Sequence, residues 1–226
     1  MSRELKYLSH RVAAGKLSRR DFLGRAAALG IATPFATSLL TKAVKAQPQK
    51  GGALRMGLTG GESTNSLDPA TWLTQVPQNF GSTWGETLVI QSPEDGSPEP
   101  VLAESWEPSE DATEWRFNIR QGVTFCDGKA LTAEDVAFSL NRLIDPETRS
   151  PAAWRLGSVQ EIVATDDYTV RYTLEKPHNE LLLHLAQSFG SIIDKDEVER
   201  LGADFGVRGL NTTGPFCWGE WVPRDH

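Results

Sequence analysis

Few residues of this chain have the types and spacing that catalysis requires. Gly60-Gly61-Glu62-Ser63 is a glycine-containing loop expected after a strand, but it lacks the spacing of a phosphate-binding loop or a dinucleotide fingerprint. No serine lies in a nucleophile elbow, and Cys126 has no histidine near it in sequence. The acid pairs Glu134-Asp135 and Asp166-Asp167 are better explained as a helix cap and a turn than as acid–base catalysts. The sequence therefore predicts a protein that is not an enzyme.

Metal-ligating residue types are few and dispersed. The four histidines are scattered along the chain, at His10, His178, His184 and His226. No Cys/His cluster has metal-ligand spacing, and we predict no cofactor. Cys126 and Cys217 are the only cysteines, too few for a disulfide scaffold. A disulfide between them is possible in an oxidising compartment, although nothing local favours it.

The N-terminal 46 residues predict an export signal. The motif Arg19-Arg20-Asp21-Phe22-Leu23 is typical of the twin-arginine route. The uncharged run from Ala26 to Leu40 is too short for a membrane-spanning helix, which needs about 20 residues. Val44-Lys45-Ala46 suggests cleavage after Ala46, so that residues 1–46 form the signal peptide. The alternative interpretation is an ordinary amphipathic N-terminal helix.

The charge of the chain changes when this signal is set aside. The whole chain has 23 basic and 30 acidic residues, and the first 46 residues contain nine of the former and two of the latter. Residues 47–226 therefore have a net charge of −14. A surface of this charge repels phosphate backbones, so nucleic acid is not an expected partner.

Hydrophobic periodicity predicts intermixed strands and helices in the mature part, an α/β or α+β class. The expected strands cover residues 53–58, 115–119, 123–125, 160–164, 168–174 and 213–222, and the expected helices cover 77–88, 133–145, 180–186 and 194–201. Thr132 and Asp135 form a capping box at the start of the second helix, and Pro146 ends it. Asp127-Gly128 predicts a tight turn, and residues 93–100 are turn-rich.

A series of motifs then resembles one family. The motifs are Leu67-Asp68-Pro69, Leu102-Ala103-Glu104-Ser105-Trp106, residues 120–128, residues 131–140, Asp145-Pro146-Glu147-Thr148 and Thr213-Gly214-Pro215-Phe216, in this order. Together they closely resemble the periplasmic solute-binding proteins of peptide-type ABC importers, the oligopeptide, dipeptide and nickel-binding family 5. The resemblance implies an α/β lobe of the periplasmic-binding-protein type II kind with a mixed sheet. Family members are considerably longer, so it also implies that residues 47–226 are an incomplete N-terminal portion and that the second large lobe is absent.

The resemblance further implies a binding site and partners. Family members hold solute in a cleft between two lobes that close by a hinge, and they bind peptides largely through backbone hydrogen bonds. The loop after the first strand is similar in position to one cleft edge, and Trp84 is a candidate for the cleft wall. The expected ligand-binding residues are Gly61, Glu62, Ser63, Thr64, Asn65 and Trp84. The alternative for the loop is a plain connection.

The expected partners are a peptide or another small solute, the permease subunits of an ABC importer and the twin-arginine translocase, with the mature protein a periplasmic monomer. Because the groups that grip peptide termini lie largely in the second lobe of the family, weak or no solute binding is expected of this chain alone. Two alternatives remain open. One is a twin-arginine-exported enzyme, and the other is a non-functional fragment of the binding protein.

Overall fold

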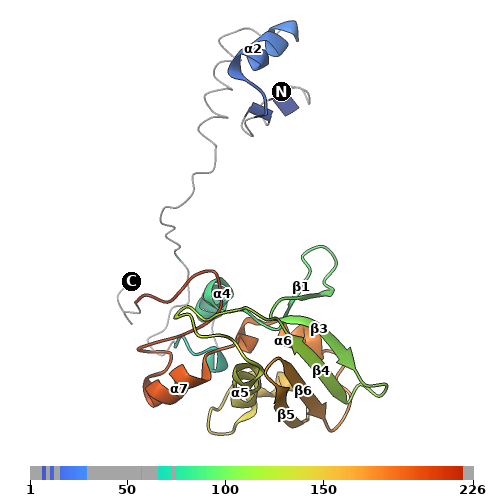
Figure 1. Cartoon of the computed structure of the whole chain (residues 1–226), viewed down its shortest axis with the longest axis vertical. Helices are drawn as coiled ribbons and strands as arrows, with labels where there is room; N and C mark the ends of the chain where they lie inside the picture. Colours follow the sequence, from blue (N-terminus) through green and yellow to red (C-terminus); the bar gives the residue numbers. More distant parts are fainter. Residues whose placement is uncertain are drawn as a thin grey trace. The chain divides into compact units, whose positions relative to one another are not determined.

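The computed structural model describes residues 7–8, 11–12, 16–29, 57, 66–72 and 75–220. The chain divides into two units, residues 1–57 and 58–226 (Figure 1). The predicted strand at 53–58 lies outside the described residues except for Gly57, which belongs to no strand.

The described part of the first unit contains the helix α2 (Arg19–Ala28). The paired arginines of the predicted signal, Arg19 and Arg20, form its first turn. Ser18 caps the helix, because its Oγ accepts a hydrogen bond from the backbone N–H of Asp21 at 3.1 Å. Among the described residues of this unit, Leu8, Val12, Phe22 and Ala26 are buried and pack together. The paired arginines therefore stand at the start of a short, capped helix.

The second unit contains a four-stranded antiparallel sheet in the order β3-β4-β6-β5 (Figure 1). Its strands are β3 (Ala103–Pro108), β4 (Glu114–Ile119), β5 (Val159–Asp166) and β6 (Thr169–Leu174). Phe117 of β4 pairs with Val170 of β6, and both are fully buried. Tyr172 is buried too, and its hydroxyl donates to the Leu156 carbonyl at 2.7 Å. The strands predicted at 115–119, 160–164 and 168–174 are thus confirmed.

The helix α5 (Ala133–Ile144) packs against β5 and β6 (Figure 1). Its start is capped as predicted, because the Asp135 carboxylate accepts from the Thr132 N–H at 3.1 Å and from the Thr132 hydroxyl at 2.9 Å. The helix ends before Pro146, as predicted. Its face toward the sheet contains the buried residues Val136, Leu140 and Leu143.

Three other predicted helices are present, α4 (Gln75–Trp84), α6 (Leu181–Leu185) and α7 (Lys195–Leu201). Helix α4 ends four residues before the predicted end, at a point where Gly85 packs closely against Ser191. Asp194 caps α7, and Gly202 follows it with a φ of 53°. Short 3-10 turns among the described residues are η1 (Pro69–Thr71), η2 (Ala153–Leu156), η3 (Ser188–Gly190) and η4 (Gly202–Asp204).

Three strands were not predicted from the sequence. The edge strand β3 has mostly exposed, polar residues, so its local pattern does not resemble a buried strand. The strands β1 (Val89–Gln91) and β2 (Pro98–Pro100) form a two-stranded hairpin whose second strand falls in the segment predicted only as turn-rich. Proline and glutamate disfavour strands, so here pairing with a neighbour overrides local propensity.

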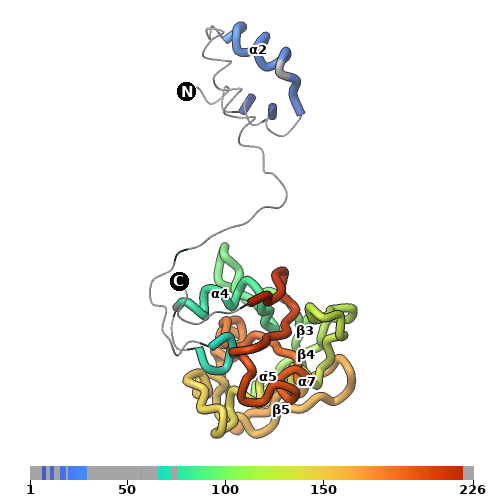
Figure 2. Tube along the Cα trace, turned by 90° about the vertical axis from the view of Figure 1, so that its left-hand side faces the viewer, coloured from blue at the N-terminus to red at the C-terminus, as the bar shows by residue number. Residues whose placement is uncertain are grey.

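The strands predicted at 123–125 and 213–222 are wrong within the described residues. At 123–125 the backbone makes only an isolated bridge, between Thr124 and Ala130. Residues 213–220 follow an irregular course that runs beside α4 (Figure 2). Gly214 donates its N–H to the Trp84 carbonyl at 2.8 Å instead of to a strand, and Pro215 has no N–H to donate. Residues 221–222 lie outside the described part of the chain.

Candidate functional site

The described part of the predicted site is centred on Trp84, at the C-terminal end of α4. The Phe80 ring stacks on Trp84 with centroids 5.9 Å apart and an interplanar angle of 4°. Trp72 meets Trp84 edge to face, with centroids 6.3 Å apart. Gly81 leaves room for the Trp72 ring, since a Cβ at this position would overlap it. Trp72, Phe80 and Trp84 together form what we term the aromatic wall.

The segment 213–218 lies against this wall. Gly214 approaches Trp84 so closely that a Cβ would collide with the Trp84 backbone, so only glycine permits the contact. This approach explains the glycine of the Thr-Gly-Pro-Phe motif. Trp218 packs with Trp84 around an apolar cluster whose buried members are Leu67, Ile193, Phe205 and Leu210.

Three buried side-chain atoms of this region have no hydrogen-bond partner among the described residues: Trp84 Nε1, Thr213 Oγ1 and Trp218 Nε1. Leaving such a group unpaired costs about 1–3 kcal/mol, so native proteins usually pair it with protein, water or ligand. Two indole N–H donors and a hydroxyl are suited to carbonyl and carboxylate oxygens. Aromatic surface with a few directed polar groups is the usual composition of a small-molecule site.

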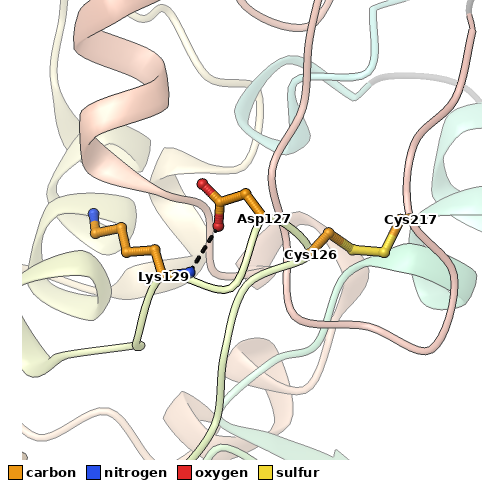
Figure 3. The surroundings of a disulfide bond; sticks show 4 residues. All are labelled: Cys126, Asp127, Lys129 and Cys217. Atoms are coloured by element: carbon orange, nitrogen blue, oxygen red, sulfur yellow. Dashed lines mark hydrogen bonds between the residues drawn. A yellow bond between two sulfur atoms is a disulfide. The ribbon is translucent and has the colours of Figure 1, made fainter.

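A disulfide between Cys126 and Cys217 holds this segment to a tight turn (Figure 3). The two Cα atoms lie 5.7 Å apart although 91 residues separate the cysteines in sequence. The turn is the predicted one, with Gly128 at a φ of 93° and the Lys129 N–H donating to Asp127 Oδ1 at 2.9 Å (Figure 3). The hydrogen bond from the Lys129 backbone, with one from the Asn211 side chain, lowers the pKa of the Asp127 carboxyl.

A charged cluster lies beside the same turn. The Lys129 ammonium donates to Asp135 at 3.1 Å, to Asp196 at 2.8 Å and to Asp194. Asn211 Nδ2 donates to the other oxygen of Asp194 at 2.9 Å. Burial alone would lower the pKa of Lys129, but the hydrogen bonds to Asp194, Asp196 and Asp135 outweigh it and raise the pKa. These five residues, termed the bridge cluster, tie the turn to the starts of α5 and α7.

The Leu67-Asp68-Pro69 motif also has a structural role. Asp68 is 5% exposed and accepts two hydrogen bonds from the Arg142 guanidinium, at 2.9 and 2.8 Å. It also accepts from the Ala70 N–H at 3.1 Å, which caps η1. This bidentate pair fastens the segment that carries Trp72 to α5, so the motif positions part of the aromatic wall.

The structure describes only some of the residues predicted to have a function. Trp84 lies in the aromatic wall, whereas Gly61, Glu62, Ser63, Thr64, Asn65 and the cleavage residue Ala46 lie outside the described residues. Thr213 and Trp218 were missed as site residues, because their segment was interpreted as a strand. The Gly-Pro pair between them was the signal against a strand.

Three further observations concern the described residues alone. The histidines were expected to be scattered, but His178 and His184 come within hydrogen-bond distance of each other, at 3.1 Å. No group of three or more His, Cys, Asp or Glu side chains in this part of the chain is arranged to hold a metal ion. None of its helices has the length and apolar character to cross a membrane.

Comparison with solved structures defines the class of protein. The periplasmic binding protein AgaA of A. tumefaciens R10, in complex with agropinic acid, matches with a TM-score of 0.66 and 31% identity over 72% of this chain and 32% of that chain. The periplasmic binding protein DppA of Helicobacter pylori, in complex with the peptide STSA, matches with a TM-score of 0.60 and 30% identity over 72% of this chain and 36% of that chain. The fold is therefore that of part of a periplasmic solute-binding protein, which confirms the predicted α/β class.

Comparison with sequences gives the family. The bacterial extracellular solute-binding proteins, family 5 Middle, match residues 97–226. The periplasmic oligopeptide-binding protein OppA of Escherichia coli strain K12 is 31% identical over 184 residues, covering 73% of this chain and 33% of OppA. The chain belongs to family 5 of the bacterial extracellular solute-binding proteins, a family of binding proteins and not of enzymes. It spans about a third of the length of the curated relatives it matches.

Proposed function

We propose that this protein captures peptides or similar small solutes outside the cytoplasm and delivers them to the membrane permease of an ABC importer. The observation that carries the proposal is the aromatic wall with two buried donors that have no partner among the described residues, Trp84 Nε1 and Trp218 Nε1, in a chain of family 5. Relatives named for oligopeptide binding, or solved with the peptide STSA, support peptides as the solute. The Cys126–Cys217 disulfide supports an oxidising, extracytoplasmic compartment.

In the proposed mode of binding, the peptide backbone lies along the aromatic wall and segment 213–218. The two indole N–H groups are buried in this structure, so they donate to peptide carbonyl oxygens only after the side chains that cover them move aside, and the stacked rings of Phe80 and Trp84 contact side chains of any apolar type. Backbone groups of Gly61 to Asn65 form a further edge of the site. Recognition through backbone atoms gives broad selectivity for sequence, which suits a protein that supplies nutrients.

Nuclear magnetic resonance can test this proposal at the weak affinity expected of the chain alone, a Kd of about 1 mM. Tripeptides added to the full chain should shift the indole N–H resonances of Trp84 and Trp218, and Trp84→Phe assigns the first of these. Trp115, stacked on Phe117 in the sheet, is the internal control and should not shift. If tripeptides at about 10 mM shift other resonances of the chain but neither of these two, the proposed binding site is wrong.

We further propose that residues 1–46 are a twin-arginine signal, removed after Ala46 to release a periplasmic domain of residues 47–226. Arg19 and Arg20 begin α2, and the Arg20 side chain is exposed, as a motif read by a receptor must be. Replacing both by lysine in the full chain should keep the protein in the cytoplasm, uncleaved and with its two thiols reduced. Arg25→Lys, in the same helix, is the matched control. Export of the double variant at the normal rate would exclude this route.

A further inference from the structure

Arg155 of η2 is a half-buried cation without an anionic partner among the described residues. Its guanidinium carbon lies 4.9 Å from the centre of the Trp154 ring and 5.4 Å from the centre of the Phe189 ring. Its nitrogens are not among the buried unpaired atoms of this part of the chain, so they reach the surface. The arginines of the described part of 58–226 that form salt bridges are Arg142, Arg171, Arg200 and Arg208. The others, Arg155 excepted, are exposed.

The position of Arg155 is fixed by its neighbours and not by an ion pair. Its carbonyl oxygen lies 2.7 Å from His184 Nδ1 and 3.0 Å from His178 Nε2, close enough for an imidazole N–H to donate to it. His184 meets Trp154 edge to face with centroids 5.8 Å apart, which orients the ring beside the guanidinium. A guanidinium that lies over aromatic rings keeps its N–H donors in its own plane, where a planar anion can meet them. Arg155 is therefore preorganised to receive a carboxylate.

Exposed apolar side chains lie on the elements around Arg155. Trp154 is 67% exposed, Ile90 of β1 is 43% exposed and Leu183 of α6 is 39% exposed. Helix α6 packs against both η2 and β1, so these side chains belong to three neighbouring elements (Figure 1). Single exposed apolar residues are ordinary, but a group of them beside polar atoms indicates an interaction surface. Tryptophan and arginine are also the residue types that most often dominate binding between proteins.

The charge of the chain narrows what covers this surface. Residues 47–226 have a net charge of −14. This charge disfavours a second copy of the chain, a nucleic acid and an anionic lipid surface, because each would bring like charge toward it. What Arg155 lacks is a single carboxylate, and the apolar side chains near it favour apolar neighbours for that carboxylate. A segment of another protein with an aspartate or glutamate between apolar residues supplies both.

We propose that Arg155, Trp154, Leu183 and Ile90 form a docking surface for a partner protein that presents an acidic side chain between apolar ones. The carboxylate accepts two parallel hydrogen bonds from the guanidinium of Arg155. The apolar neighbours of the carboxylate cover Trp154 and Leu183 and remove them from water. The surface shares no residue with the aromatic wall or segment 213–218, so it does not depend on the proposed solute site.

The test uses the full chain with its disulfide intact and two probe peptides. One is leucine–glutamate–leucine with both ends blocked, and the other has glutamine in place of glutamate. In nuclear magnetic resonance the first should shift the indole N–H resonance of Trp154, which Trp154→Phe assigns. The second should bind at least about threefold more weakly, because an amide has no charge to attract the guanidinium. Arg155→Gln should remove this preference, whereas Arg116→Gln, at an exposed arginine of β4, should keep it.

Three results would overturn the proposal. One is a Trp154 resonance that neither peptide moves at about 10 mM. Another is equal affinity for the two peptides in the unaltered chain, a comparison that requires no variant to fold. The third is a shift of the Trp154 resonance when the chain alone is diluted, which would make a second copy the occupant. Shifts of Trp84 and Trp218 without Trp154 would support the solute site and overturn the docking surface, so the two proposals fail separately.

Discussion

The sheet core, formed by β3 to β6 and α5, differs from the region around the bridge cluster in what holds it together. In the sheet core, buried apolar side chains such as Phe117, Val170 and Leu140 pack between a sheet and a helix. Around the bridge cluster, an irregular segment is fastened by a disulfide, by ion pairs and by single backbone hydrogen bonds. The first region derives its stability from area removed from water, and the second from a few specific ties.

The two regions should therefore respond differently to the loss of a single side chain. The loss of one core side chain leaves a cavity that weakens the whole cooperative unit. The loss of one tie should instead release the segment that it fastened, while the sheet persists, because stability is not uniform across a structure. Substitutions in each region can distinguish global destabilisation from local release of the segment.

The largest effect is expected for Phe117→Ala in β4. Phe117 is fully buried, so its truncation should lower the free energy of unfolding by about 3–5 kcal/mol. Urea titration followed by far-ultraviolet circular dichroism measures this change. Phe216→Ala, at a ring that is 67% exposed, is the matched control and should change stability by less than about 0.5 kcal/mol. Equal losses from the two variants would contradict a core centred on Phe117.

Removal of the disulfide should have the next largest effect. The double variant Cys126→Ser/Cys217→Ser should have a free energy of unfolding lower by about 2–4 kcal/mol, because the bond closes a long loop in the unfolded chain. Chymotrypsin should cleave after Trp218 at least about tenfold faster in this variant, since segment 213–218 is then free to open. The circular dichroism of the sheet should remain unchanged below the transition. Unaltered cleavage would mean that other contacts hold the segment.

Lys129→Met should lower the free energy of unfolding by less than removal of the disulfide, by about 2 kcal/mol. The Lys129 side chain is 30% exposed, so water already screens part of its interactions. The loss arises from leaving the buried carboxylates of Asp135 and Asp194 without their cation. Lys195→Met, which removes a partner of the exposed Glu134 at 3.5 Å, is the control and should cost less than about 0.5 kcal/mol. Urea titration of both variants at neutral pH gives the comparison.

The stabilisation by Lys129 should also depend on pH. The pKa of Lys129 is raised in the folded protein above its ordinary value of 10.5. A raised pKa means that the folded state binds the proton more tightly, so the stabilisation is complete below pH 10.5 and falls as pH increases above it. The difference in stability between the native chain and Lys129→Met should therefore be constant from pH 7 to 10 and shrink beyond 10.5. A difference that persists at higher pH would place its origin outside the charge of Lys129.

The two regions also differ in how far the sequence could predict them. The strand containing Phe117 and the helix begun by Thr132 were predictable, because alternation and capping are local signals. The pairing of Cys126 with Cys217, across 91 residues, has no local signal, and neither does the contact of Lys129 with Asp194. At the candidate site the family resemblance indicated Trp84. Trp218 was hidden, because a run of aromatic residues resembles a strand until its long-range contacts are known.

The smallest effect concerns the residue where local and long-range interactions meet. Asp135 caps α5 through Thr132, a local contact, and also binds Lys129, a contact of the bridge cluster. Thr132→Ala removes only the local hydroxyl hydrogen bond, so it should lower the free energy of unfolding by about 1 kcal/mol. Thr124→Ala, at an exposed threonine, is the control and should have less than half of this effect. Because Asp135 keeps Lys129 as a partner, the rate of chymotrypsin cleavage after Trp218 should not change in Thr132→Ala. Faster cleavage would show that the helix cap supports the bridge cluster and that the two regions are coupled through Asp135.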